Sequence, residues 1–308
     1  MKSASRESIQ LPGGHSFRLL RWGKNLRDVE LVLSPERAEP IKGQGSHWHY
    51  HAEMELTFFT SGEGTRFVGD DIGFFRAGDL VLLGEQLPHY WHTLGPSSGL
   101  SIQWHFPENH AFWNLPETLP LNGLFRKASR GIHFSPGVAA QAGLKMESIA
   151  RIGGIDRLGR FLELLAFLEV QSAWEQSFLS TRPFALSHTS AHRGRMAEAL
   201  RFLTANFRSD IRLDDLLRLT GLSKATFARQ FKKHAGKSYR ECLGQIRLEG
   251  ACRDLRETDR AILDIALSNG FGQLSFFNRL FRRRYRCSPR QYRQRMRKKA
   301  CVPRNTTG

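Results

Sequence analysis

The chain has 308 residues, of which 40% are hydrophobic and 11% aromatic, and its 46 Lys and Arg against 29 Asp and Glu give a formal net charge of +17. This composition suits about two folded domains and excludes a disordered chain, and no apolar run is long enough to span a bilayer. The first fourteen residues lack the apolar core of a signal peptide, so we expect a cytoplasmic protein.

Residues 1 to about 107 contain short segments rich in aromatic and β-branched residues, separated by turn residues such as Gly62 and Gly78. Many short strands at even spacing are typical of a sandwich or a small barrel. The predicted strands are 17–22, 30–33, 53–60, 64–69, 73–84 and 100–106.

A polar pattern interrupts this region. His49, His51 and Glu55 share strand parity, so on a regular strand their side chains would point to one face. Converging imidazole and carboxylate groups can ligate Zn, Mn or Fe, or they can hydrogen-bond a polar organic molecule. The pattern alone leaves both possibilities open.

Together with Gly43 and Gly62, these residues have a spacing that resembles the first cupin motif. Residues 77–91 resemble the second motif, although His89 is two residues away from the usual position of its histidine. The resemblance implies a cupin-like β-barrel that acts as a sensor domain. Because such sensors usually bind organic effectors, we expect a small polar effector, a carbohydrate or a similar metabolite, at His49, His51, Glu55, His89 and Trp91.

We expect no cofactor in this domain. The alternative is a divalent metal held by His49, His51, Glu55 and His89. Nearby aromatic residues could stack on a sugar, but core filling is the more economical interpretation for each of them. They are Trp48, Phe67 and Trp104.

From residue 109 the hydrophobic period becomes helical, which predicts helices over 138–152 and 157–174, joined at Gly153 and Gly154. We expect this antiparallel pair either to pack on the barrel or to contact a second copy of the chain. Residues 175–192 have mixed polarity and no clear period, so they are predicted to be a linker.

The last third of the chain contains two predicted helix-turn-helix units. The first has a helix at 213–219, a turn at Gly221 and a helix after Ser223; the second has a turn at Gly270 and a helix over 273–285. A helix over 195–207 precedes them. A long helix over 239–256 separates them, and it could hold the two second helices about 34 Å apart, one turn of DNA.

The residues that carry these units have the order and spacing of a known family. The pattern resembles the AraC/XylS family of bacterial transcription regulators, over about a third of the chain. It consists of Leu216, Gly221, Ser223, Phe227, Phe231, Gly236, the segment 246–255, Ile265, Ala266, Gly270, Phe271, Ser275, Phe277, Arg279, Phe281, Ser288, Pro289 and Arg293. The family usually has glycine where this chain has Arg286, so a turn with positive φ would be strained there.

The resemblance implies an α+β protein of two domains, with a cupin-like β-barrel and helical pair over 1–174 and an all-α double helix-turn-helix domain over 193–297. Residues 298–308 would form a basic tail. It also implies a sequence-specific transcription activator, not an enzyme. Such a protein binds double-stranded DNA and a small polar effector and works with RNA polymerase. We expect a monomer or a homodimer that does not associate with a membrane.

Charge supports the DNA-binding part of this interpretation. From Ala191 onward there are 28 basic and 10 acidic residues, whereas the first 190 residues have 18 and 19. Such a basic domain is typical of a nucleic-acid binder, whose affinity comes largely from phosphate contacts. All four cysteines lie in the same part without metal-site spacing, so we expect reduced thiols at Cys242, Cys252, Cys287 and Cys301.

Helical geometry predicts which side chains face DNA. Phe227 and Phe231 should face the core of the first unit, and Phe277 and Phe281 that of the second. The opposite faces are then the candidate DNA-contacting residues, with arginine suited to guanine, Asn and Gln to adenine, and alanine or leucine to a thymine methyl. They are Lys224, Ala225, Ala228, Arg229 and Lys232, then Gln273, Leu274, Ser275, Asn278, Arg279 and Arg282.

Two other functional classes stay open on sequence alone. A metal-dependent cupin enzyme would show bound metal and turnover. A constitutive DNA binder would occupy DNA without an effector.

Overall fold

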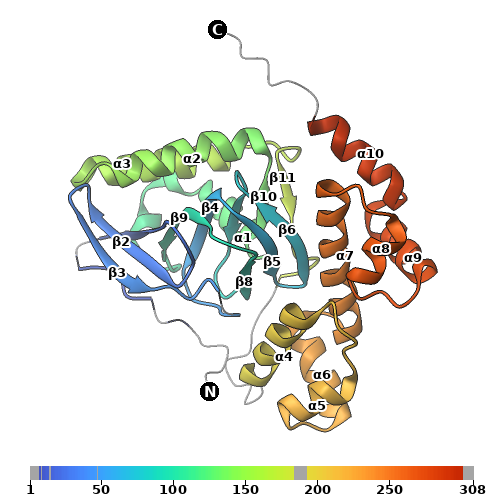
Figure 1. The fold of residues 1–308 in the computed structure, drawn as a ribbon. Helices are drawn as coiled ribbons and strands as arrows, with labels where there is room; N and C mark the ends of the chain where they lie inside the picture. The colour runs from blue at the N-terminus through green and yellow to red at the C-terminus, as the bar shows by residue number, and fades with distance from the viewer. Residues whose placement is uncertain (1–6, 8, 14, 47, 184–192, 301–308) are drawn as a thin grey trace. The chain divides into compact units, whose positions relative to one another are not determined.

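The computed structural model describes Glu7 and residues 9–13, 15–46, 48–183 and 193–300. The chain divides into two compact units, Met1–Ala197 and Glu198–Gly308. The first contains the strands and the second is helical, as predicted (Figure 1). Among the described residues, none of the helices combines the length and apolarity needed to cross a bilayer.

The strands of the first unit pair as two sheets. An eight-stranded sheet has the order β11-β10-β7-β4-β9-β1-β2-β3, and a three-stranded sheet has the order β6-β5-β8. Their bounds are β1 (Phe17–Trp22), β2 (Asp28–Ser34), β3 (Arg37–Lys42), β4 (Met54–Ser61), β5 (Glu63–Val68), β6 (Asp71–Arg76), β7 (Leu80–Leu83), β8 (His89–Thr93), β9 (Ser98–Trp104), β10 (Ile132–Phe134) and β11 (Gln176–Phe178).

Several details differ from the sequence prediction, which did not include β3, β8 and β10. The segment 73–84 is not one strand, because Gly78 with φ 88° turns the chain between β6 and β7, which belong to different sheets. The strands also do not close into one barrel in the part of the chain described here. An isolated bridge joins His49, in the segment before β4, to His89 on β8.

Strand alternation separates two cores. On β4, Met54, Leu56 and Phe58 join the cluster that includes the helices, whereas Phe59 joins the cluster between the sheets. Since successive side chains of a strand point to opposite faces, Glu55 and Thr57 share the inner face with Phe59. Trp104 is in the helix-side cluster, so it fills the core and cannot stack on a ligand between the sheets.

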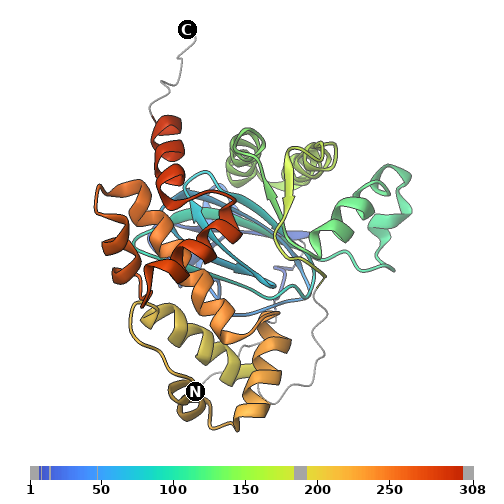
Figure 2. The same ribbon diagram turned by 90° about the vertical axis from the view of Figure 1, so that its right-hand side faces the viewer.

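The helix-side core is closed by α1 (Leu121–Ala128), α2 (Pro136–Ala150) and α3 (Gly154–Glu169), preceded by short 3-10 turns at Ala111–Asn114 and Pro116–Thr118. Figure 2 shows α2 and α3 side by side over the sheet. The predicted helical pair is confirmed and packs on its own unit. However, α3 ends at Glu169, and β11 lies at the start of the segment predicted to be the linker; residues 184–192 of that segment lie outside the described residues.

The helices of the C-terminal part are α4 (Arg193–Asn206), α5 (Leu213–Thr220), α6 (Lys224–Ala235), α7 (Tyr239–Glu257), α8 (Ile262–Ser268), α9 (Leu274–Tyr285) and α10 (Pro289–Ala300). The boundary between the compact units falls within α4. Both predicted helix-turn-helix units, α5–α6 and α8–α9, are present, and α7 contacts α6, α8 and α9. The predicted tail begins inside α10, a helix that the sequence interpretation missed, and residues 301–308 lie outside the described residues.

The two helix-turn-helix units repeat each other at an offset of fifty residues. The repeat is clearest at the ends of α6 and α9. Gly236 follows α6 with φ 71°, and Arg286 follows α9 with φ 55°. A side chain in this left-handed region costs about 1–2 kcal/mol. Arg286 therefore occupies a strained turn, as its departure from the family pattern predicted.

Alanine at the two turn glycines should separate backbone strain from steric overlap. Gly221 and Gly270 both have positive φ, 61° and 82°, but an added Cβ at Gly221 meets nothing within 4 Å, whereas at Gly270 it would lie 2.6 Å from the carbonyl oxygen of Phe207. We expect Gly221→Ala to lower the free energy of unfolding by about 1–2 kcal/mol. Gly270→Ala should lower it by about 1–3 kcal/mol more because of overpacking.

Urea titrations of the full chain can assign these losses to one unit. All six tryptophans lie in the first 174 residues. Tryptophan fluorescence therefore reports the first unit alone and should keep the wild-type midpoint. Helical circular dichroism, which reports the helices of both units, should show the losses. Equal losses for both substitutions would contradict the close packing of Gly270.

Candidate functional site

The second helix of each helix-turn-helix unit is called its recognition helix. The first of them, α6, presents a polar face opposite two buried rings. Ser223 caps the helix, and its hydroxyl accepts a hydrogen bond from the backbone N–H of Thr226 at 3.4 Å. Phe227 and Phe231 are buried. This orientation leaves the predicted DNA-facing side chains exposed, namely Lys224, Ala225, Ala228, Arg229 and Lys232.

The second recognition helix, α9, follows the same rule with one difference. Phe277 and Phe281 are buried, and Gln273, Ser275, Arg279 and Arg282 are exposed. Leu274 and Asn278 are only half-exposed, and Leu274 packs against the core of the unit. Leu274 is therefore less available for a thymine methyl than the sequence prediction assumed.

Sequence reasoning missed Phe276, which remains 44% exposed on α9. The guanidinium carbon of Arg279 lies 5.4 Å from the centre of its ring, a cation–π distance. The sequence prediction that Phe277 and Phe281 face the core already placed the ring of Phe276 on another side of the helix, but Phe276 was not included among the DNA-facing residues.

Positive charge surrounds α9. After Asp264 the sequence has twelve basic residues and no acidic residue. Arg282, Arg283 and Arg284 at the end of the helix are exposed. Such a surface suits phosphate contacts that position the helix without reading the sequence.

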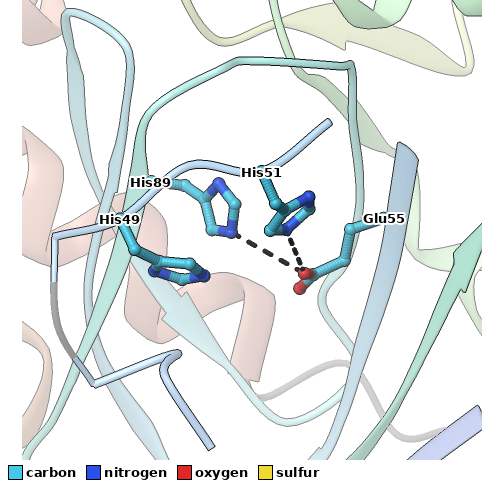
Figure 3. A group of neighbouring side chains, drawn as sticks. All are labelled: His49, His51, Glu55 and His89. Carbon is cyan, nitrogen blue, oxygen red and sulfur yellow. Dashed lines mark hydrogen bonds and ion pairs between the residues drawn. The ribbon is translucent and has the colours of Figure 1, made fainter. Parts of the chain in front are cut away.

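The predicted effector residues of the first unit converge in one buried cluster. His49, His51, Glu55 and His89 are each 6% exposed or less, and one ligand atom from each lies within 4.8 Å of the others. Figure 3 shows their side chains pointing toward one another. Only Glu55 lies on β4; His49 and His51 precede that strand, and His89 begins β8.

Glu55 is the centre of the hydrogen bonding. Its Oε2 accepts from Nε2 of Gln103 at 2.6 Å and from Nε2 of His51 at 3.0 Å, and Nε2 of His89 lies 3.7 Å away. Its Oε1 accepts from the hydroxyl of Thr57 at 2.5 Å. Gln103 and Thr57 were missed from sequence, although both are polar residues at inward positions of otherwise apolar strands.

Charged and polar side chains extend the cluster toward the N-terminus. Nε of Arg18 donates to Oε1 of Gln103 at 2.6 Å, and its Nη2 lies 3.1 Å from Oε1 of Glu7. Oε2 of Glu7 in turn lies 3.6 Å from Nε2 of His49. The network therefore joins the buried carboxylate of Glu55 to the half-buried carboxylate of Glu7.

The charged forms of His51 and Glu55 stabilise each other. Burial opposes the imidazolium of His51, but the hydrogen bond and charge of Glu55, with the charges of Glu7 and Glu53, raise its pKa. Burial also opposes the carboxylate of Glu55, but the hydrogen bond from His51 and the nearby imidazole of His89 hold its pKa well below its usual value. Nδ1 of His51 also faces the carbonyl oxygen of Glu53 at 2.9 Å, so the doubly protonated ring satisfies both nitrogens.

The same geometry fits a divalent metal. Nδ1 of His51 and of His89 lie 2.9 and 2.8 Å from backbone carbonyl oxygens, a contact that commonly orients metal-ligating imidazoles. Three imidazoles and a carboxylate are donors that suit Zn, Mn or Fe. Binding would release the Nε2 proton of His51.

A small cavity of about 40 Å³ adjoins the cluster, lined by Trp91, Glu55 and the segment 43–45. An ordered water needs about 10–15 Å³, so the cavity is large enough for only a few waters. Nε1 of Trp91 is buried without a hydrogen-bond partner among the described residues. Its ring packs edge-on against Phe59 and Phe75, so Trp91 serves the core at least as much as the cavity.

Comparison with known proteins gives matches mainly in the C-terminal unit. Residues 216–295 match a model described as a helix-turn-helix domain. The regulatory protein PocR of Salmonella typhimurium is 33% identical over 112 residues, which are 36% of this chain and 37% of PocR, so the chain spans little more than a third of that relative. The HTH-type transcriptional activator RhaS of Salmonella arizonae is 23% identical over 282 residues, 91% of this chain and 96% of RhaS.

Among solved structures, a probable AraC family transcriptional regulator from Rhodopseudomonas palustris is 27% identical, with 33% of this chain and 96% of that chain covered and a TM-score of 0.32. Two helix-turn-helix units joined by α7 define the class of the C-terminal unit, a double helix-turn-helix domain. This domain is similar to the DNA-binding domains of AraC-type regulators, as the sequence resemblance predicted.

Removing the central carboxylate should destabilise the first unit. Glu55→Ala leaves donors on Gln103, Thr57 and His51 without their acceptor, and each buried unsatisfied group costs about 1–3 kcal/mol. We expect a loss of about 2–4 kcal/mol in the free energy of unfolding, measured by tryptophan fluorescence during a urea titration. Thr60→Ala, at an exposed position of the same strand, is the control and should change stability by less than about 0.5 kcal/mol. Equal midpoints for the two variants would show that the network contributes nothing.

Proposed function

We propose that this protein is a sequence-specific transcription regulator of the activator type, which binds double-stranded DNA through its C-terminal unit and senses a small polar effector in its first unit. The observation that carries the proposal is the pair of outward-facing recognition helices on one basic domain. We place its action in the cytoplasm, at promoters where it works with RNA polymerase.

The proposed DNA contacts follow from side-chain chemistry. Arg229 on α6 and Arg279 on α9 can each donate two hydrogen bonds to O6 and N7 of guanine. Asn278 and Gln273 suit adenine, although half-burial of Asn278 limits its reach. The remaining exposed arginines suit phosphates, so they supply affinity without specificity.

In the sensor, the polar cluster supports an effector with several hydrogen-bonding groups. Pockets that enclose organic ligands typically measure about 300–1,000 Å³, far more than the 40 Å³ present here. A carbohydrate would therefore have to displace the segment 43–45 that borders the cavity. Effector binding and movement of this segment would be one event, and differential affinity for the two arrangements would provide the signal.

A bound divalent metal is the competing occupant, favoured by the converging donor atoms of His49, His51, Glu55 and His89. In that case the cluster would sense or require the ion, and the organic effector would bind elsewhere or as a further ligand. Catalysis by such a centre is not part of the proposal.

The DNA-binding proposal is tested by selecting duplexes from a randomised library with the full chain. Arg229→Ala and Arg279→Ala should each weaken binding to the selected site by about 1–3 kcal/mol and relax the preference at one base pair. Arg284→Ala, the control, should weaken selected and random duplexes alike and reduce the salt dependence of binding. Equal losses on both kinds of duplex for all three variants would mean that another face of the helices reads DNA.

The occupant of the cluster is tested by metal analysis of the purified protein together with calorimetric titration of monosaccharides. An organic effector predicts substoichiometric metal and saturable sugar binding that His49→Ala abolishes. Stoichiometric Zn, Mn or Fe that is lost in His51→Ala would replace the organic effector with a metal site.

A further inference from the structure

One face of α7 joins the two helix-turn-helix units. Arg247, Gly250 and Asp254 are spaced three and four residues apart on this helix, so they form one stripe along it. Arg247 is half-buried and Gly250 is buried. The segments that pack on this stripe belong to the two helix-turn-helix units, one segment to each.

The first of these segments is the loop between α4 and α5, which leads into the first helix-turn-helix unit. Nε of Arg247 donates to the carbonyl oxygen of Phe207 at 2.7 Å, and its Nη2 donates to that of Ser209 at 2.8 Å. The two bonds come from Nε and Nη2, two donors held in fixed geometry by the planar guanidinium. Partial burial lowers the pKa of Arg247, but a guanidinium remains charged in proteins.

The second segment is the turn between α8 and α9. A Cβ at Gly270 would lie 2.6 Å from the same carbonyl oxygen of Phe207 and 2.7 Å from Nε of Arg247, so the turn packs directly on this hydrogen bond. Nδ2 of Asn269 donates to Oδ2 of Asp254 at 2.7 Å. Asn269 is fully buried, and its side chain covers Gly250.

We propose that Arg247 is a positioning residue that fixes the separation of the two recognition helices and thereby the spacing of the two DNA half-sites. The loop that it bonds enters α5 and α6, and the turn that it supports begins α9. Relative movement of α6 and α9 must therefore break or bend the bonds of one guanidinium. The inference rests on the proposed DNA-binding function and adds to it the residue that sets half-site spacing.

The test uses the full chain and a duplex selected from a random library, together with versions of that duplex that carry one or two extra base pairs between the half-sites. A rigid pair of recognition helices tolerates such insertions poorly, because each shifts and rotates the second groove. We expect the wild type to lose at least about tenfold in affinity per insertion, which is the size of one good base contact. Arg247→Ala should bind the original duplex more weakly than the wild type does. On insertion it should lose only about threefold in affinity, which is less than the loss of one good base contact would cause.

Arg247→Lys provides a second, milder variant. It retains the charge, but a single ammonium cannot reproduce the two bonds in their fixed geometry, so its spacing penalty should lie between those of the wild type and Arg247→Ala. Arg240→Ala is the matched control, because it removes an exposed arginine of the same helix whose side chain hydrogen-bonds the neighbouring Tyr239. It should keep the full wild-type penalty.

These measurements separate positioning from general destabilisation, since a variant that is only less stable loses affinity equally on every duplex. Wild-type penalties in both Arg247 variants, with helical circular dichroism retained, would overturn the inference. So would a wild type that tolerates insertions. Failure to select any duplex would overturn the DNA-binding proposal itself, and this inference with it.

Discussion

Burial of two phenylalanines in each recognition helix is the constraint on which the C-terminal unit depends. Phe227 and Phe231 are 0% and 1% exposed, and Phe277 and Phe281 are both fully buried. Rings four residues apart fix the rotation of a helix about its axis, because both must face the same core. The positions that remain outside are then determined, and Arg229 and Arg279 occupy the same outward position of the two helices.

The first unit depends on a different kind of constraint. Its buried polar groups include the network around Glu55, where several donors share one carboxylate. A buried charge of this kind is stable only while its partners remain in place. The cluster is therefore a sensitive position, where a ligand that supplies new donors, a metal, or loss of one partner would change the packing between the two sheets. This sensitivity is the physical basis for the proposal that the cluster senses.

Sequence patterns were sufficient where a local rule determined the structure. Ser223, Gly221 and Gly270 marked the ends of helices, and the phenylalanine spacing gave their orientation. Patterns were insufficient where long-range pairing decides, as with β11, which is ordered by pairing to β10 rather than by its own composition. The convergence of His49, His51 and Glu55 was predicted correctly from a regular strand that does not exist, since the two histidines precede β4 and the bridge to His89 aligns them. Gln103 and Arg18 could not be assigned to the cluster without the register of β9 and β1.

The central claim is that DNA recognition resides entirely in the C-terminal helical unit and that the first unit only modulates it. Binding of a fragment from Ala191 to Gly308 to duplexes selected with the full chain, measured over a range of salt concentrations, tests this most directly. The account predicts the same base preferences as the full chain and an affinity that falls steeply with salt, as expected from phosphate contacts. A fragment that retains its helical circular dichroism but shows no affinity for DNA at low salt would contradict it.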